Sequence, residues 1–292
     1  MALGSPAHQK TGQPCTGLRW VVAHPREAKH IIQWFRMDIR LQSAPYSIYG
    51  DESGLHSLIV SGEGKVASAA ATAFLYAFSG ADKSTAWINI GTAGHQQAPI
   101  GTLMIANRVL DHESNQAWYP SRVFSSSIKS SGLICVSRME TSYPENAMYD
   151  LESAGFYGVA SKFTTHELIH CMKVVSDNRS SEPSREAAQN AMDSLIPQQD
   201  AVRCFIDDLI NLSREESERL SVPLELGQFL QQWSFTVSQQ HQLASLMRQW
   251  DALGGASSVV ASLCEQSLTP KQVLRILKQQ LFDEVYVRNS DD

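Results

Sequence analysis

Short apolar runs alternate with segments of helical periodicity over the first two thirds of the chain. Runs of this length are typical of buried strands, and the longer segments are typical of helices. The predicted strands cover residues 18–23, 46–49, 56–61, 86–90, 101–110, 132–136 and 168–175. The predicted helices cover residues 25–37, 66–78 and 146–163. This alternation predicts an α/β fold with a single mixed, mostly parallel sheet flanked by helices.

The remainder of the chain is rich in Gln, Leu and Ser, and its apolar positions have helical spacing. The predicted helices there are 185–194, 201–211, 224–253 with a break, and 270–282. We therefore expect three parts: a flexible N-terminal tail over 1–17, an α/β domain over 18–197, and a C-terminal helical extension over 198–292.

Composition narrows the class of protein. Of the 292 residues, 43% are hydrophobic and 18% are charged, which is ordinary for a globular protein with a sizeable core. The net charge of −6 gives no basic footprint for a nucleic acid, and no apolar run is long enough to cross a membrane. Five scattered cysteines are typical of reduced thiols in the cytoplasm. We expect a cytoplasmic protein whose partner is a small molecule.

Two acidic residues in apolar surroundings are the first candidates for chemistry. Glu152 lies within the predicted helix 146–163, and Asp177 follows a predicted strand. Each alone is an ordinary surface charge or a cap. A buried carboxylate is costly without a partner, so two of them suggest a site where one binds hydroxyl groups and the other handles a proton. Cleavage of a sugar–base bond needs this pair of roles.

Glycine-rich turns follow two of the predicted strands. Gly62-Glu63-Gly64-Lys65 precedes the Ala-rich helix, where backbone amides can approach an anion. Gly91-Thr92-Ala93-Gly94-His95 offers small residues and one hydroxyl to a sugar. Taken alone, the first segment is explained better by a tight strand–helix turn, and the second is explained equally well by a plain turn.

The segment His166-Glu167-Leu168-Ile169-His170 matches the HExxH zinc pattern. That pattern requires a helix with both histidines on one face. Here the segment continues into a strand-like apolar run, where the two histidines would lie ~13 Å apart. We predict no metal and no cofactor, and a zinc hydrolase is the alternative that metal analysis would test.

Five motifs in order resemble the purine nucleoside phosphorylase/uridine phosphorylase family. The pattern is nearest to the methylthioadenosine/S-adenosylhomocysteine nucleosidases and covers roughly the first two thirds of the chain. The motifs lie at strand ends or helix starts and are Trp20–Ala28, Ile59–Val66, Ile88–Gly94, Asp150–Gly155 and Val174–Asp177.

The resemblance implies roles for single residues. Glu152 matches the glutamate that holds the ribose hydroxyls, and Asp177 matches the aspartate that protonates the departing purine. Thr92 matches a small hydroxyl residue near the ribose, and Glu27 falls where the nucleosidases orient the attacking water. Further candidate substrate ligands in these motifs are Gly91, Leu151 and Ser176, and candidate anion ligands are Gly64 and Lys65.

The choice between water and phosphate as nucleophile follows from charge. The resemblance places the arginines of bacterial phosphorylases at positions that match Glu27 and Asn89, and neither is cationic here. Arginine is the usual ligand of phosphate, and Glu27 would repel it. Hydrolysis is therefore favoured. Phosphorolysis is the alternative for two reasons. Arg26 and Lys65 lie near these motifs in the sequence and are candidate anion ligands, and the sequence of residues 153–157 is more similar to the phosphorylases.

Several departures from the family pattern motivate a rival from another class. Glu63 and His95 replace uncharged or small residues, and the segment between Cys135 and Met148, which normally frames the base, is short. The rival is a nucleoside-binding module without catalysis. The resemblance also implies a homo-oligomer, because relatives complete the pocket from a neighbouring subunit. Candidates to stack on the base are Trp118, Tyr119 and Phe156.

Overall fold

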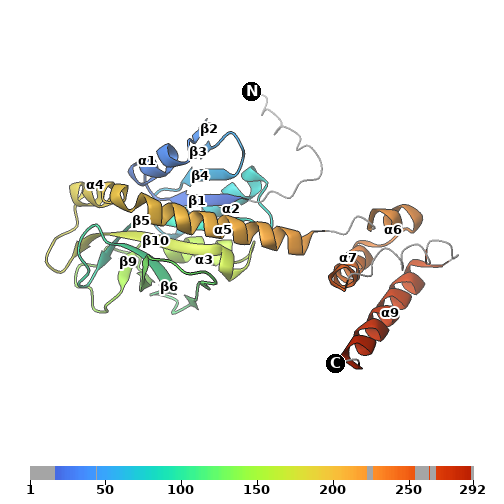
Figure 1. Ribbon diagram of the computed structural model, residues 1–292. Helices are drawn as coiled ribbons and strands as arrows, with labels where there is room; N and C mark the ends of the chain where they lie inside the picture. Colours follow the sequence, from blue (N-terminus) through green and yellow to red (C-terminus); the bar gives the residue numbers. More distant parts are fainter. Residues whose placement is uncertain (1–16, 44, 222–225, 254–262, 264–267, 291–292) are drawn as a thin grey trace. The chain divides into compact units, whose positions relative to one another are not determined.

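The chain divides into two compact units, Met1–Ser217 and Glu218–Asp292. The first unit contains the sheet, and the second is helical (Figure 1). The tail expected over 1–17 lies outside the described residues except for its last position. The computed structural model describes residues 17–43, 45–221, 226–253, 263 and 268–290.

A ten-stranded sheet forms the centre of the first unit, in the order β10-β6-β8-β9-β5-β1-β4-β3-β2, with β7 paired to β6. β10 also pairs with β5, so β5, β10, β6, β8 and β9 close into a ring. The strands are β1 (Leu18–Val22), β2 (Asp38–Ser43), β3 (Tyr46–Gly50), β4 (His56–Val60), β5 (Ala86–His95), β6 (Leu103–Asp111), β7 (Ala117–Trp118), β8 (Lys129–Cys135), β9 (Met148–Asp150) and β10 (Ile169–Asn178).

The prediction of a mixed sheet is confirmed, but the sheet is not mostly parallel. β1 runs parallel to β4 and β5, and β5 runs parallel to β10. By contrast β2–β3, β3–β4, β5–β9 and β6–β10 are antiparallel. Only residues 51–55 join β3 to β4, and such a short connection permits an antiparallel neighbour but no helical crossover.

Helices cover both faces of the sheet because side chains along each strand alternate between them. In β1, Trp20 belongs to the core under α1, α4 and α5, whereas Val21 belongs to the core under α2 and α3. The helices of this unit are α1 (Pro25–Trp34), α2 (Lys65–Ser79), α3 (Ser153–Ala160), α4 (Arg185–Asp193) and α5 (Gln199–Leu220).

Several elements differ from the prediction. The helix expected over 146–163 is the short strand β9 followed by α3. The change occurs where Asp150 accepts a hydrogen bond from the Ser153 amide (3.0 Å), which ends the strand and starts the helix. The edge strand β2 was not predicted, because its two apolar residues alternate with charged and polar residues, as is common in exposed edge strands.

α3 approaches α2 very closely at Gly155. A Cβ at this position would overlap the carbonyl oxygen of Lys65, so only glycine fits. This contact fixes the first turn of α3 beside the first turn of α2. Both helices start at the same edge of the sheet, where the strands that precede them end.

The second unit has its own core. Its helices α6 (Leu226–Gln232), α7 (Val237–Ala252) and α9 (Pro270–Ser290) bury Phe229, Leu243 and Leu277 together. The long predicted helix 224–253 is broken between α6 and α7, and residues 222–225 lie outside the described part. None of the helices described in either unit combines the length and the hydropathy that a membrane crossing requires.

The division between the units lies C-terminal to the boundary predicted after residue 197. The reason is α5, whose side chains Val202, Phe205 and Leu209 are fully or almost fully buried in the core of the α/β unit. Residues 199–217 thus belong to the first unit, and the second compact unit starts at Glu218.

Candidate active site

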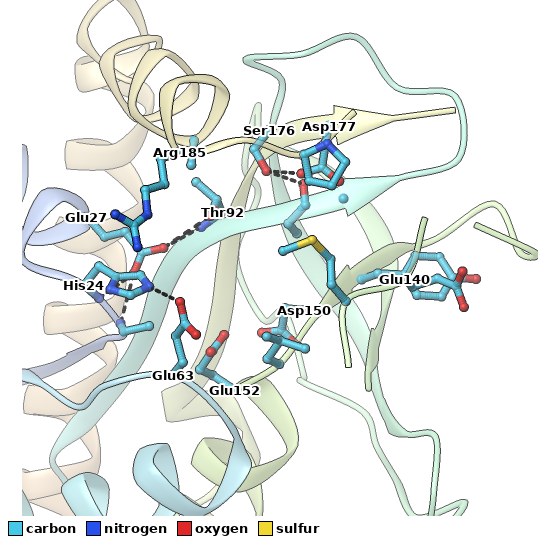
Figure 2. Close-up of a pocket in the computed structure, with 18 of the residues that line it drawn as sticks. His24, Glu27, Glu63, Thr92, Glu140, Asp150, Glu152, Ser176, Asp177 and Arg185 are labelled. Carbon is cyan, nitrogen blue, oxygen red and sulfur yellow. Dashed lines mark hydrogen bonds and ion pairs between the residues drawn. The ribbon is translucent and has the colours of Figure 1, made fainter. Parts of the chain in front are cut away.

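A cavity of about 380 Å³ opens at the edge where β1, β5, β9 and β10 end (Figure 2). Six of the predicted site residues line it, and they come from segments far apart in the sequence. These residues are Glu27, Thr92, Leu151, Glu152, Ser176 and Asp177. The ends of neighbouring strands bring them together, as expected for a ligand site in an α/β sheet.

Glu27 lies in the first turn of α1 and is 4% exposed. Its Oε2 accepts hydrogen bonds from the backbone amides of Ala23 (2.9 Å) and His24 (3.0 Å). Its Oε1 accepts from the Thr92 amide (3.1 Å) and the Thr92 hydroxyl (3.3 Å). Four donors occupy the lone pairs of both oxygens, so this carboxylate is fixed in place.

Glu152 precedes α3 and is 7% exposed. Its Oε1 accepts a hydrogen bond from the Gly64 amide (2.9 Å). Burial and the nearby Asp150 carboxylate raise the pKa of Glu152 to about 7, against the opposing effects of Lys173 and the Gly64 amide. Near neutral pH this group is therefore half ionised, and its acceptor strength depends on pH.

A buried ion pair supports this side of the cavity. The ammonium of Lys173, on β10, lies 2.8 Å from Oδ2 of Asp150, and both side chains are almost completely buried. Asp150 also accepts the amide and the hydroxyl of Ser153. Burial lowers the pKa of Lys173, but Asp150, Glu152 and Glu27 raise it by more. Lys173 thus stays charged and offsets part of the surrounding negative charge.

Asp177 ends the part of β10 that faces the cavity and is 7% exposed. The Ser176 hydroxyl donates to its Oδ1, and the Tyr143 hydroxyl donates to its Oδ2. Each oxygen keeps a second lone pair, and Asp177 lines the cavity. The carboxyl group can therefore exchange a proton with a ligand while both hydroxyls hold it.

Tyr143 is fixed by several contacts although it lies in a loop. Its backbone has φ of 44°, a value uncommon for a residue with a side chain. Gln96 and Arg179 donate to its carbonyl oxygen at 3.0 and 2.9 Å. Burial, and the hydrogen bond to Asp177, raise the pKa of this phenol, so it remains a donor.

Two glycines of β5 make room for these acids. A Cβ at Gly91 would lie 2.8 Å from Oε1 of Glu27, and one at Gly94 would lie 2.6 Å from Oδ2 of Asp177. Gly91 was predicted as a substrate ligand, and the structure places it against Glu27 rather than in the cavity lining. In this strand small residues let two buried carboxylates approach the backbone.

The two predicted anion ligands are both engaged elsewhere. The Gly64 amide donates to Glu152. The Lys65 ammonium lies 2.7 Å from Asp111 and also contacts Glu113. Neither residue lines the cavity. The structure therefore does not place the glycine turn as an anion cradle.

The aromatic residues suggested for base stacking also lie outside the cavity lining. Phe156 is fully buried in the core, Trp118 packs on Tyr157, and Tyr119 is 64% exposed. His95, another departure from the family pattern, accepts the backbone amides of residues 97 and 98 through Nδ1 and shapes a turn.

The HExxH segment forms a 3₁₀ turn and the start of β10 rather than an α-helix. His166 pairs with the Tyr157 hydroxyl (3.0 Å), and His170 pairs with the carbonyl oxygen of Glu167 (3.0 Å) and packs on Phe205. Within the described residues, no group of three or more His, Cys, Asp or Glu side chains is placed to hold a metal ion. The segment has a structural role.

Four residues of the site were not predicted as such: Asp150, Lys173, Tyr143 and Arg185. Asp150 opens one of the recognised motifs and Lys173 directly precedes another, and the lysine in an apolar run was a signal of a buried partner. Tyr143 lies in the loop before β9, where no periodicity points to its contact. Arg185 starts α4 and lines the cavity with Arg26 and His24 (Figure 2).

The arrangement favours a ligand that becomes positively charged. The buried acids Glu27, Glu152 and Asp177 line one cavity, and the buried cation Lys173 already pairs with a fourth acid, Asp150. Fixed carboxylates in a water-poor site stabilise positive charge that develops during a reaction. They disfavour a dianion at the same point.

No family model matches the sequence, and neither does any curated protein. Solved structures do match. One is a 5′-methylthioadenosine/S-adenosylhomocysteine nucleosidase from Neisseria meningitidis, bound to methylthio-immucillin-A, with 17% identity over 61% of this chain and 94% of that chain and a TM-score of 0.52. Another is the 5′-methylthioadenosine nucleosidase of Arabidopsis thaliana, with 18% identity over 66% and 97% of the chains and a TM-score of 0.54. The resemblance seen in the sequence is thereby confirmed at the level of the fold.

Proposed function

We propose that this chain, which has the fold of those nucleosidases, cleaves the N-glycosidic bond of a purine nucleoside with water as the nucleophile. One observation carries the proposal: Glu27, Glu152 and Asp177 line a single cavity, each nearly buried. Cleavage of this bond needs a group for the sugar, one for the water and one for the departing base. The three acids supply these roles.

Asp177 protonates the base as it leaves. When the proton departs, the carboxylate that forms is stabilised at once by hydrogen bonds from Ser176 and Tyr143. Hydrogen bonds to an ionised group are about twice as strong as those to a neutral one, so they favour this direction of transfer. Ser176 and Tyr143 are positioning residues in this scheme.

Glu152 accepts the two ribose hydroxyls. Its carboxylate is held by the Gly64 amide at one oxygen and lines the cavity, so it can orient the sugar carbon that reacts. Because the pKa of Glu152 is about 7, this clamp becomes stronger as the pH rises through neutrality.

Glu27 activates the water. Three of its four donors are backbone amides that cannot turn away, but the fourth is the Thr92 hydroxyl at 3.3 Å. When this hydroxyl rotates, a lone pair on Oε1 of Glu27 becomes free to accept a hydrogen bond from the water, and the hydroxyl oxygen can accept one too. Two fixed acids near the sugar also stabilise its developing positive charge.

The nucleobase is expected beside Asp177. The cavity lining also contains Val136, Met139, Leu151 and Tyr149, which are apolar or aromatic. A flat, uncharged ring suits such a lining, whereas a second charge does not. This supports a purine, whose ring nitrogen can take the proton from Asp177.

A nucleoside screen by chromatography, with and without phosphate, tests the proposal. We expect free base and free ribose at a rate that does not depend on phosphate. Formation of ribose 1-phosphate would instead establish phosphorolysis. Binding without release of base from any compound would establish the non-catalytic binding module and overturn the proposal.

We also propose a homo-oligomer, as the resemblance implies, and a cytoplasmic location, which the dispersed cysteines favour. Met139 supports an assembly, because it lines the cavity and is 63% exposed, so that a second subunit would cover it. Sedimentation of the full chain tests the oligomer. A monomer at all concentrations would contradict it.

A further inference from the structure

Most basic side chains near the cavity already have a protein partner. Lys173 pairs with Asp150, and His24 lies 2.7 Å from Glu63. Lys65 is held outside the cavity lining by two acids. Two cations of the lining differ from these, Arg26 and Arg185, which form no hydrogen bond or ion pair with any described residue.

The lack of a partner is costly at Arg26. Its Nε is buried and has no acceptor among the described residues. A buried donor left without a hydrogen bond loses free energy, although six carboxylates line the same cavity and none of them is within bonding distance. A ligand that brings its own acceptor would satisfy this donor.

Two helices place these arginines together. Arg26 lies in the first turn of α1 and Arg185 in the first turn of α4. The two helices are joined by a hydrogen bond of 2.8 Å between His30 and Asp193. Helix N-termini carry partial positive charge, which adds to that of the side chains.

The position of this end relative to the three acids indicates which part of a nucleoside it meets. In Figure 2, Arg185, His24 and Glu27 lie on one side of Glu152, and Asp177 lies on the other. With the base at Asp177 and the ribose hydroxyls at Glu152, the 5′ carbon points away from Asp177. It therefore points toward the arginines.

We infer that the substrate carries an anionic group on its 5′ carbon, a phosphate or a carboxylate, which Arg26 and Arg185 bind. This inference rests on the proposed function, because that function sets the orientation of the nucleoside. Guanidinium groups suit both anions, since they form paired hydrogen bonds with two oxygens.

The same arginines are less suited to an inorganic phosphate nucleophile. A nucleophile must reach the anomeric carbon, which lies between Glu27 and Glu152 in this orientation. Both carboxylates are nearly buried there, and they repel a dianion more strongly than in water. A substituent on the 5′ carbon need not reach the anomeric carbon, so its charge can pair with the two guanidinium groups instead.

Matched substrates test the inference on the full chain. Adenosine is compared with adenosine 5′-monophosphate and with adenosine 5′-carboxylate, and kcat/KM for base release is measured for each. We expect the anionic compounds to be preferred. Arg185→Met should lower the ratio of anionic to neutral kcat/KM by on the order of 10- to 100-fold, and Arg185→Lys should lower it less.

Arg108→Met is the matched control, because Arg108 pairs with Glu145 at the surface and does not line the cavity. It should leave the ratio unchanged. A preference for adenosine, or an unchanged ratio in Arg185→Met, would overturn the inference. So would an effect of Arg185→Met confined to phosphate-dependent cleavage, since the arginines would then bind the nucleophile.

Failure of the proposed function would be visible separately. If no base is released from any compound, calorimetric binding of adenosine and of adenosine 5′-monophosphate decides the inference alone. Tighter binding of the monophosphate that Arg185→Met abolishes would support an anion site in a protein that does not cleave. Equal binding of the two would overturn it.

Discussion

The sugar side and the base side of the cavity hold their acids in different ways. On the sugar side, backbone amides fix Glu27 and Glu152. On the base side, the hydroxyls of Ser176 and Tyr143 hold Asp177. Amides are set by the backbone, whereas hydroxyls rotate and donate or accept. The acids on the sugar side are therefore held in place by the backbone, whereas the acid on the base side is held by groups that can adjust when a proton is exchanged.

Asp177→Asn removes the proposed proton donor of the base side. An amide keeps the shape of the carboxyl group but cannot give a proton in this step. We expect kcat to fall by about 10³-fold, within the range of a lost general acid. Base release from the best substrate of the screen measures it.

Asp208→Asn, an exposed change on α5, is the control and should leave the rate unaltered. Circular dichroism of both variants checks the fold. Near-normal turnover by Asp177→Asn on every cleavable nucleoside would remove the proposed distinction between the two sides.

Lys173→Met tests whether the sugar side depends on its buried ion pair. The change leaves Asp150 without its cation in a fully buried position. We expect the free energy of unfolding to fall by about 3–4 kcal/mol in urea titrations. The pKa of Glu152 should also rise, because Lys173 lowers it in the native protein.

Lys65→Met is the matched control for this pair. Lys65 also contacts two acids, but its side chain is 22% exposed, so water replaces much of the interaction. We expect a loss of less than about 1 kcal/mol. Equal losses in the two variants would show that the buried pair adds nothing special to the sugar side.

The sugar side was also easier to predict from the sequence than the base side. Glu27 follows a predicted strand and lies in a recognisable motif. Glu152 also lies in such a motif, but the strand before it was predicted as a helix, so the motif and not the strand pattern indicated its place. Three predicted ligands do not line the cavity: Gly64 and Gly91 contact the acids, and Lys65 pairs elsewhere. A motif gives the residue type but does not show which neighbour its amide or ammonium group contacts.

The base side and the direction of the strands were harder to predict. Tyr143 reaches Asp177 from a loop with a left-handed backbone conformation, and neither feature leaves a periodic trace. The polar edge strand β2 was missed for a related reason, since its pattern resembles a loop. A mixed sheet thus looked more parallel than it is.

Glu152→Gln tests whether the sugar side needs the charge of Glu152. Glutamine keeps a carbonyl acceptor for the Gly64 amide but carries no charge to receive the ribose hydroxyls. We expect kcat/KM to fall by about 30-fold, as for loss of hydrogen bonds to a charged group. Steady-state kinetics with the exposed change Glu215→Gln as control measure this loss.

The protonation of Glu152 also predicts how kcat/KM changes with pH. Glu152 has a pKa of about 7, raised by burial and by Asp150, so it is protonated below that pH and ionised above it. Because the ionised form binds the hydroxyls, kcat/KM of the native protein should rise as the pH increases through about 7. This limb should be missing in Glu152→Gln, and its persistence would assign it to another group.

Tyr143→Phe is the subtlest test of the base side. It removes one of the two hydroxyls that hold Asp177 and leaves the ring, which packs edge-on against Tyr149. We expect kcat to fall by about 10-fold with little change in KM, because the lost hydrogen bond stabilises the carboxylate formed during proton transfer. Tyr157→Phe is the matched control, since Tyr157 is also fully buried and bonded through its hydroxyl, but to His166 outside the cavity lining. An equal fall of kcat in both variants would mean that Tyr143 acts only through the packing of the fold, and the base side would then depend on Ser176 alone.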